Sequence, residues 1–178
     1  MRSLILIRGL SGSGKKTLAS LLCADSEYRD TVCFEDYFID EEGVYVFDPS
    51  AIKEAHSWCV EEAENLMAEN EVVVVANCFT RKWECLPYFD LASKLSFNIS
   101  IISLYDAGLN DSALSERCVN EVPPHVIQKQ RQRWDLDVTP GRNNNTPRRP
   151  PPPPKYIPNP YYDWEGGPHN RRRKMNRY

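Results

Sequence analysis

The sequence predicts an α/β fold in which helices cover both faces of a parallel β-sheet. Short apolar segments alternate, up to residue 138, with segments of helical spacing that run for roughly 10 to 20 residues. The segment 71–76 is apolar on both faces, so a strand there must be covered from both sides. A glycine-rich loop directly after the first apolar segment is the third indication of this fold class.

Each element is predicted from its local pattern. Strands are expected where β-branched residues and leucines cluster, at 3–8, 31–34, 71–76 and 97–104. Helices are expected where apolar residues recur at helical spacing, at 15–23, 49–69, 82–95, 112–119 and 124–134. Asp48 is suited to cap the second helix, and Pro49 to occupy its first position, where a missing N–H does no harm.

The alternation ends after Val138, and the composition changes there. Nine of the fourteen prolines lie from Pro147 onward, and residues 141–178 carry nine Lys or Arg against two Asp or Glu. Because the whole chain has a net charge of −3, a basic tail follows an acidic body. Such a tail cannot bury enough apolar area to offset its ordering entropy. We therefore predict one domain over 1–138 and a disordered, proline-rich tail over 139–178.

Composition excludes several classes of protein. Hydrophobic residues make up 41% and charged residues 26%, which is ordinary for a globular protein. Because no apolar run reaches about 18 residues, we predict no membrane insertion. The six cysteines form no C-x-x-C pair, and the N-terminal segment lacks the cleavage site of a signal peptide. We expect reduced thiols and a cytoplasmic or nuclear location.

The most specific motif is G-x-x-x-x-G-K, between a predicted strand and a predicted helix. Its glycines let backbone N–H groups converge on a phosphate, and the helix N-terminus adds about half a positive charge. The motif lysine reaches the β- and γ-phosphates. The alternative is a glycine-rich turn without a ligand. We predict a P-loop of the nucleoside-triphosphatase class that binds ATP or GTP through Gly9, Ser11, Gly12, Ser13, Gly14, Lys15, Lys16 and Thr17.

The residue after the P-loop lysine departs from the motif. A P-loop has Ser or Thr there, whose hydroxyl coordinates Mg²⁺, but this chain has Lys16 and places Thr17 one residue later. One residue along a helix is a rotation of about 100°, so Thr17 does not simply replace the missing hydroxyl. Either Lys16 substitutes in part for the charge of the metal ion, or metal-dependent chemistry is impaired. A requirement for Mg²⁺ is therefore in doubt.

Five further fragments follow the P-loop in a fixed order. They are FEDYF at 34–38, GVYVFDP at 43–49, EAHSW at 54–58, WECLPY at 83–88 and RQRW at 131–134. The ordered set resembles the P-loop kinase-like domain of the Nedd-4-binding-protein-2-like proteins, which belongs with phage-type polynucleotide 5′-kinases. The resemblance covers about residues 3–138. It implies a P-loop kinase fold, ATP or a related nucleotide, Mg²⁺, and phosphorylation of a 5′-hydroxyl of RNA or DNA.

The resemblance implies roles at three positions. The family's catalytic base, the first Asp of an Asp-Asp-aromatic motif, corresponds to Glu35, which is followed by Asp36. A carboxylate there can still accept a proton from a hydroxyl. The alternative interpretation is that Glu35 and Asp36 are surface carboxylates that cap a turn. Arg117 corresponds to a basic residue of the family's lid helix, or is a solvated helix charge. Asn77 is all that remains of the family's Asp-Asn-Thr-Asn, as a substrate contact or a loop residue.

The predicted tail carries two motifs of its own. Residues 153–156 fit P-P-x-Y, a polyproline II ligand that docks into the aromatic groove of WW domains. This predicts binding of WW-domain ubiquitin ligases through Pro153, Pro154 and Tyr156. The basic cluster 171–174 is a nucleic-acid arm, a nuclear import signal or a solubilising tail.

Two functions from different classes follow. The first is an ATP-dependent kinase that acts on RNA or DNA. In it Lys15 holds phosphate, Glu35 or Asp36 is the base, Arg117 stabilises the transferring phosphoryl group, and the tail steers the polynucleotide. The alternative is a catalytically degenerate, nucleotide-binding adaptor that recruits WW-domain ubiquitin ligases through its P-P-x-Y motif.

Overall fold

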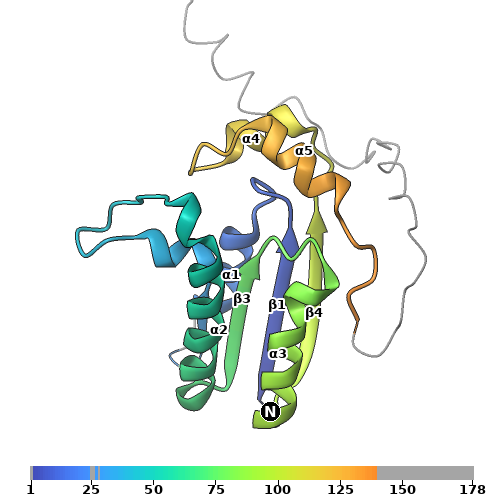
Figure 1. Cartoon of the computed structure of the whole chain (residues 1–178). Helices are drawn as coiled ribbons and strands as arrows, with labels where there is room; N and C mark the ends of the chain where they lie inside the picture. Colours follow the sequence, from blue (N-terminus) through green and yellow to red (C-terminus); the bar gives the residue numbers. More distant parts are fainter. Residues whose placement is uncertain (1, 25–26, 28, 140–178) are drawn as a thin grey trace, which may run out of the picture.

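A four-stranded parallel sheet forms the centre of the fold (Figure 1). The computed structural model describes residues 2–24, 27 and 29–139, so the tail from residue 140 onward and its motifs lie outside the described residues. The strand order is β2-β3-β1-β4. The strands are β1 (Ser3–Gly9), β2 (Arg29–Val32), β3 (Val72–Asn77) and β4 (Asn98–Tyr105). Because all neighbouring strands are parallel, their carboxyl ends meet at one edge of the sheet.

Helices cover both faces of this sheet, which confirms the predicted fold class. One face packs against α1 (Lys15–Cys23), and the other against α2 (Ile52–Glu69) and α3 (Lys82–Leu95). Two short helices, α4 (Asp111–Arg117) and α5 (Pro124–Gln132), lie beyond the carboxyl ends of the strands, at the top of Figure 1. Among the described residues, no helix has the length and apolar character needed to cross a membrane.

The alternation along β1 and β3 divides the core into two layers. Leu4 and Leu6 pack with residues of α2 and α3, whereas Ile7 packs with Ala19 of α1. The central strand β3 is buried on both sides from Val73 onward, which explains why its sequence is an unbroken apolar run. Each fully buried side chain of this size contributes roughly 1.5–3 kcal/mol.

Two element boundaries differ from the prediction because carboxylates bond to backbone N–H groups. The second strand ends at Val32, because Asp36 Oδ2 accepts the N–H of Cys33 at 2.8 Å and turns the chain into the 3₁₀ helix η1 (Phe34–Phe38). Asp48 does cap the next segment, through Ser50 N–H at 2.8 Å, but this segment is a 3₁₀ helix, η2 (Pro49–Ala51). The α-helix α2 starts only after it, at Ile52.

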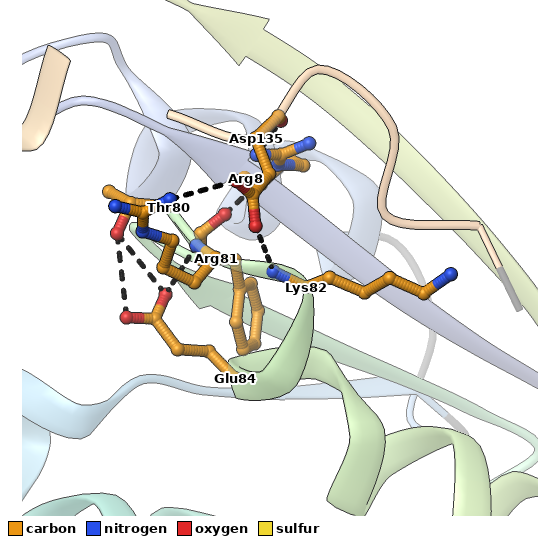
Figure 2. A network of polar contacts seen from close by, with 7 residues as sticks. Arg8, Thr80, Arg81, Lys82, Glu84 and Asp135 are labelled. Carbon is orange, nitrogen blue, oxygen red and sulfur yellow. Dashed lines mark hydrogen bonds and ion pairs between the residues drawn. The ribbon is translucent and has the colours of Figure 1, made fainter. Parts of the chain in front are cut away.

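The chain after α5 turns back onto the sheet edge, so α5 ends two residues before the predicted position. Trp134 is buried there, with the guanidinium of Arg8 3.8 Å from its ring centroid. Arg8 also donates to the carbonyl of Asp135 at 2.9 Å. The Asp135 carboxylate accepts from Arg81 at 3.1 Å and from Lys82 N–H at 2.9 Å, as Figure 2 shows. This network holds the segment after α5 against the start of α3.

Candidate nucleotide and acceptor site

The loop between β1 and α1 presents backbone N–H groups at the sheet edge. Gly12 and Gly14 have φ angles of +80° and +92°, which glycine adopts without strain. Leu18 N–H donates to Gly14 O at 3.0 Å. This is the first bond of α1, so the N–H groups of residues 15–17 have no acceptor within the helix. Together with the helix dipole, they favour an anion at this position.

Three cationic side chains and one carboxylate line the cavity at this loop. The cavity has a volume of about 260 Å³, and most of the predicted phosphate-binding residues border it. Its wall contains Ser11, Gly12, Gly14, Lys15, Lys16, Thr17, Glu35 and Arg117. Lys15 is only 6% exposed, and its Nζ donates to Leu10 O at 3.0 Å. Gly9 and Ser13 do not line the cavity; both are buried, and a Cβ atom on Gly9 would come within 2.4 Å of Ser13 Oγ.

Gly12 lies so close to α4 that only glycine fits. A Cβ atom there would be 2.1 Å from the Leu114 carbonyl oxygen, in addition to its positive φ. Gly12→Ala should lower the free energy of unfolding by at least about 2 kcal/mol, measured by urea denaturation. Gly43→Ala is the matched control, because Gly43 also has a φ of +80° but has open space around it. Equal losses in both variants would show that the contact with α4 is not tight.

A glutamine from α5 holds the P-loop in place. Gln130 Oε1 accepts Ser11 N–H at 3.0 Å, and Gln130 Nε2 donates to Ser11 Oγ at 3.0 Å. Beneath these bonds, Leu10 packs with Leu114, Ile127 and Trp134. Sequence reasoning missed Gln130, because 119 residues separate it from Ser11 and no local pattern marks it.

The two candidate base residues have different environments. Asp36 caps the turn at Cys33 N–H, as described above, and its side chain is 36% exposed. The Glu35 side chain is 18% exposed and lines the phosphate cavity. Asn77, at the end of β3, positions this turn: its Oδ1 accepts Phe34 N–H at 2.9 Å. The carboxylate that borders the cavity is therefore Glu35, and Asp36 stabilises the backbone beside it.

Lys16 joins α1 to both carboxylates. Its Nζ is 3.1 Å from Asp36 Oδ1 and 3.8 Å from Glu35 Oε2. Burial opposes the charged form, but the Cys33, Asp36 and Glu35 side chains outweigh it and raise the pKa of Lys16 above its ordinary value. Lys16 is therefore a cation at neutral pH.

These residues do not fit a Mg²⁺ ion at the usual P-loop position. The metal is normally held by the hydroxyl of the residue after the lysine. Here that residue ends in an ammonium group, which has no lone pair to offer and repels a divalent cation. In the part of the chain that the structure describes, no group of three or more His, Cys, Asp or Glu side chains is arranged to hold a metal ion.

A larger cavity of about 380 Å³ adjoins the phosphate cavity. The two share the wall residues Ser11, Glu35, Asn120 and Val122. The wall of the larger cavity includes two pairs of stacked rings: Phe34 lies on His56 with 4.8 Å between ring centroids, and Tyr45 lies on Phe47 at 6.4 Å. Burial lowers the pKa of His56, so its ring is neutral at pH 7. The aromatic residues at 45 and 47 can be seen in the sequence, but the sequence does not show that they share a cavity with Ser11 of the P-loop.

Comparison with known proteins supports the same fold. No protein-family model matches the chain. The chain is 33% identical over 97 residues to NEDD4-binding protein 2 of Homo sapiens, a match that covers 54% of this chain but only 5% of that protein. A chain of the Pnkp1/Rnl/Hen1 RNA repair complex has a TM-score of 0.52 at 17% identity, over 74% of this chain and 43% of that one. Chaetomium thermophilum Kti12 in complex with ADP-AlF3 has a TM-score of 0.54 at 15% identity, over 74% and 80%.

The chain therefore has a P-loop kinase-like fold, as the sequence predicts. Its sequence similarity to NEDD4-binding protein 2 confirms the resemblance recognised from the ordered fragments. Because the chain spans a small part of that relative, and the structural neighbours are distant in sequence, these likenesses do not by themselves transfer an activity or a partner.

Proposed function

We propose that the chain is a nucleotide-dependent phosphotransferase that acts on a 5′-hydroxyl of RNA or DNA. The observation that carries this proposal is the place of Glu35. It lies on the boundary between the phosphate cavity and the larger aromatic cavity. A general base must lie between the phosphoryl donor and the hydroxyl that attacks it. The fold is shared with Kti12, whose structure is in complex with ADP-AlF3, and with a chain of an RNA repair complex, which supports the nucleotide and the nucleic-acid parts of the proposal.

Each side chain of the site has a defined part in this reaction. Lys15 and the N–H groups of residues 15–17 hold the β- and γ-phosphates of ATP or GTP. Glu35 accepts the proton of the acceptor hydroxyl. Arg117, the last residue of α4, stabilises the charge on the transferring phosphoryl group. The larger cavity is within the usual size of a small-ligand pocket, and its aromatic rings suit the stacking of a terminal base.

The test is transfer of label from γ-labelled ATP to an oligonucleotide with a free 5′-hydroxyl. RNA and DNA of the same sequence are compared, each with a 5′-phosphorylated copy as the control for the blocked hydroxyl. We expect label only on the oligonucleotides with a free hydroxyl. If nucleotide binds but neither oligonucleotide is labelled, with or without added Mg²⁺, the proposed activity is wrong.

A second candidate is a nucleotide-binding adaptor without transfer activity. The ion pairs of Lys16 favour it, because they engage both carboxylates that could act as the base. The P-P-x-Y motif, outside the described residues, would supply the partner site. The name of NEDD4-binding protein 2 indicates that this relative binds a NEDD4 protein, and the motif extends the idea to WW-domain ubiquitin ligases.

The adaptor role predicts that Tyr156→Ala weakens capture by an isolated WW domain at least tenfold, because Tyr156 fills the groove that recognises the motif. The measurement is a titration of the full-length chain with a labelled WW domain. Tyr161→Ala removes a nearby tyrosine outside the motif and should leave the affinity unchanged. Equal affinities for the wild type and Tyr156→Ala would rule out this contact.

A further inference from the structure

The Lys16 ammonium lies where a positive charge can interact with a bound phosphate. It belongs to the wall of the phosphate cavity and lies within 4 Å of two carboxylates, that of Glu35, which borders the cavity, and that of Asp36, which does not. One of these, Asp36, is held in position by Cys33 N–H. The Lys16 cation therefore lies beside the phosphate cavity and pairs with two negative groups, of which Glu35 would otherwise repel a nucleotide there.

The surrounding charges disfavour the binding of a metal cation beside Lys16. The cavity wall already contains Lys15, Lys16 and Arg117 against the single carboxylate of Glu35. The positive N-terminus of α1 adds to this field. A divalent ion beside Lys16 would be repelled and would have to displace the ammonium from its carboxylate partners. In P-loop proteins with Ser or Thr at this position, by contrast, the hydroxyl draws the ion in.

We infer that Lys16 is a built-in counter-ion and that the P-loop binds nucleoside di- and triphosphates as the metal-free anion. This inference rests on the nucleotide binding proposed above and specifies the form of the nucleotide. Lys16 neutralises the phosphates in place of the ion and shields them from Glu35 and Asp36. The ion pair of Lys94 with Glu64, between α3 and α2, borders neither of the two cavities.

The test is the affinity of the full-length chain for a fluorescent ADP analogue, with EDTA and with excess Mg²⁺. For the wild type, we expect dissociation constants that agree within about threefold. For Lys16→Thr, which restores the hydroxyl, we expect the affinity in EDTA to fall at least about tenfold and Mg²⁺ to strengthen binding. Lys94→Thr removes a lysine from an exposed pair and should behave as the wild type.

The outcomes separate this inference from the proposed function. Binding by the wild type only in the presence of Mg²⁺ would overturn the role of Lys16 and leave nucleotide binding intact. Absence of binding under both conditions would overturn both. If Lys16→Thr does not fold, the comparison of the wild type with and without Mg²⁺ still decides the inference.

Discussion

Glu35→Gln is expected to reduce phosphoryl transfer to a 5′-hydroxyl oligonucleotide by about 10²- to 10⁴-fold, while nucleotide affinity changes little. The amide keeps the shape of the side chain but cannot accept the proton of the acceptor hydroxyl. Glu35 is the carboxylate that borders both cavities. The measurement is the initial rate of label transfer at saturating nucleotide and acceptor, with nucleotide affinity determined separately on the same preparation.

Asp36→Asn provides the contrast to this variant. Asparagine keeps an oxygen that can accept Cys33 N–H but loses the ion pair with Lys16, so the free energy of unfolding should fall by no more than about 1 kcal/mol. The transfer rate should fall by much less than in Glu35→Gln. If Asp36→Asn abolishes transfer while Glu35→Gln retains it, the base is Asp36 and the reading of the turn is wrong.

The second large effect is expected for Lys15→Met, which should weaken nucleotide binding about 10- to 150-fold. This range corresponds to the loss of one charged hydrogen bond, worth about 1.5–3 kcal/mol. Lys15 is buried in the phosphate loop, so no solvent screens its charge as it would on the surface. The measurement is a titration with a fluorescent ADP analogue, and label transfer by the same variant reports any contaminating kinase.

Lys94→Met is the matched control for this substitution. It removes the same charge from an exposed pair with Glu64 and should leave nucleotide affinity unchanged. Because Lys15 also donates to Leu10 O, urea unfolding of Lys15→Met must show that the fold is retained. A folded Lys15→Met chain with wild-type affinity would place the nucleotide elsewhere on the molecule.

Much of the fold was predictable because its causes are local. The apolar run 71–76 required cover on both faces, and β3 is buried on both. The G-x-x-x-x-G-K motif placed a loop between a strand and a helix, where β1 and α1 occur. The start of the α-helix at Ile52 and the end of β2 at Val32 were missed. There, Asp48 and Asp36 bond to nearby backbone N–H groups, and such short caps compete with strand and helix patterns.

The site was predictable only in its parts. The residues at 15, 16 and 35 could be named from motifs. The contact of Lys16 with Glu35 and Asp36 could not, because it forms between α1 and the turn that follows a different strand, β2. The hydrogen bonds between Gln130 and Ser11 connect residues that are 119 positions apart in the sequence. Neither contact has a periodicity or spacing that a sequence displays.

The sequence by itself therefore determined the order of strands and helices, the phosphate loop and the missing metal-ligand hydroxyl. These depend on backbone propensities and on side-chain chemistry at fixed spacing along the chain. The tertiary structure decided which carboxylate borders both cavities, what Lys16 contacts and which aromatic rings line the larger cavity. These depend on how parallel strands bring distant loops to one edge of the sheet, where packing and charge, rather than position in the chain, select the neighbours.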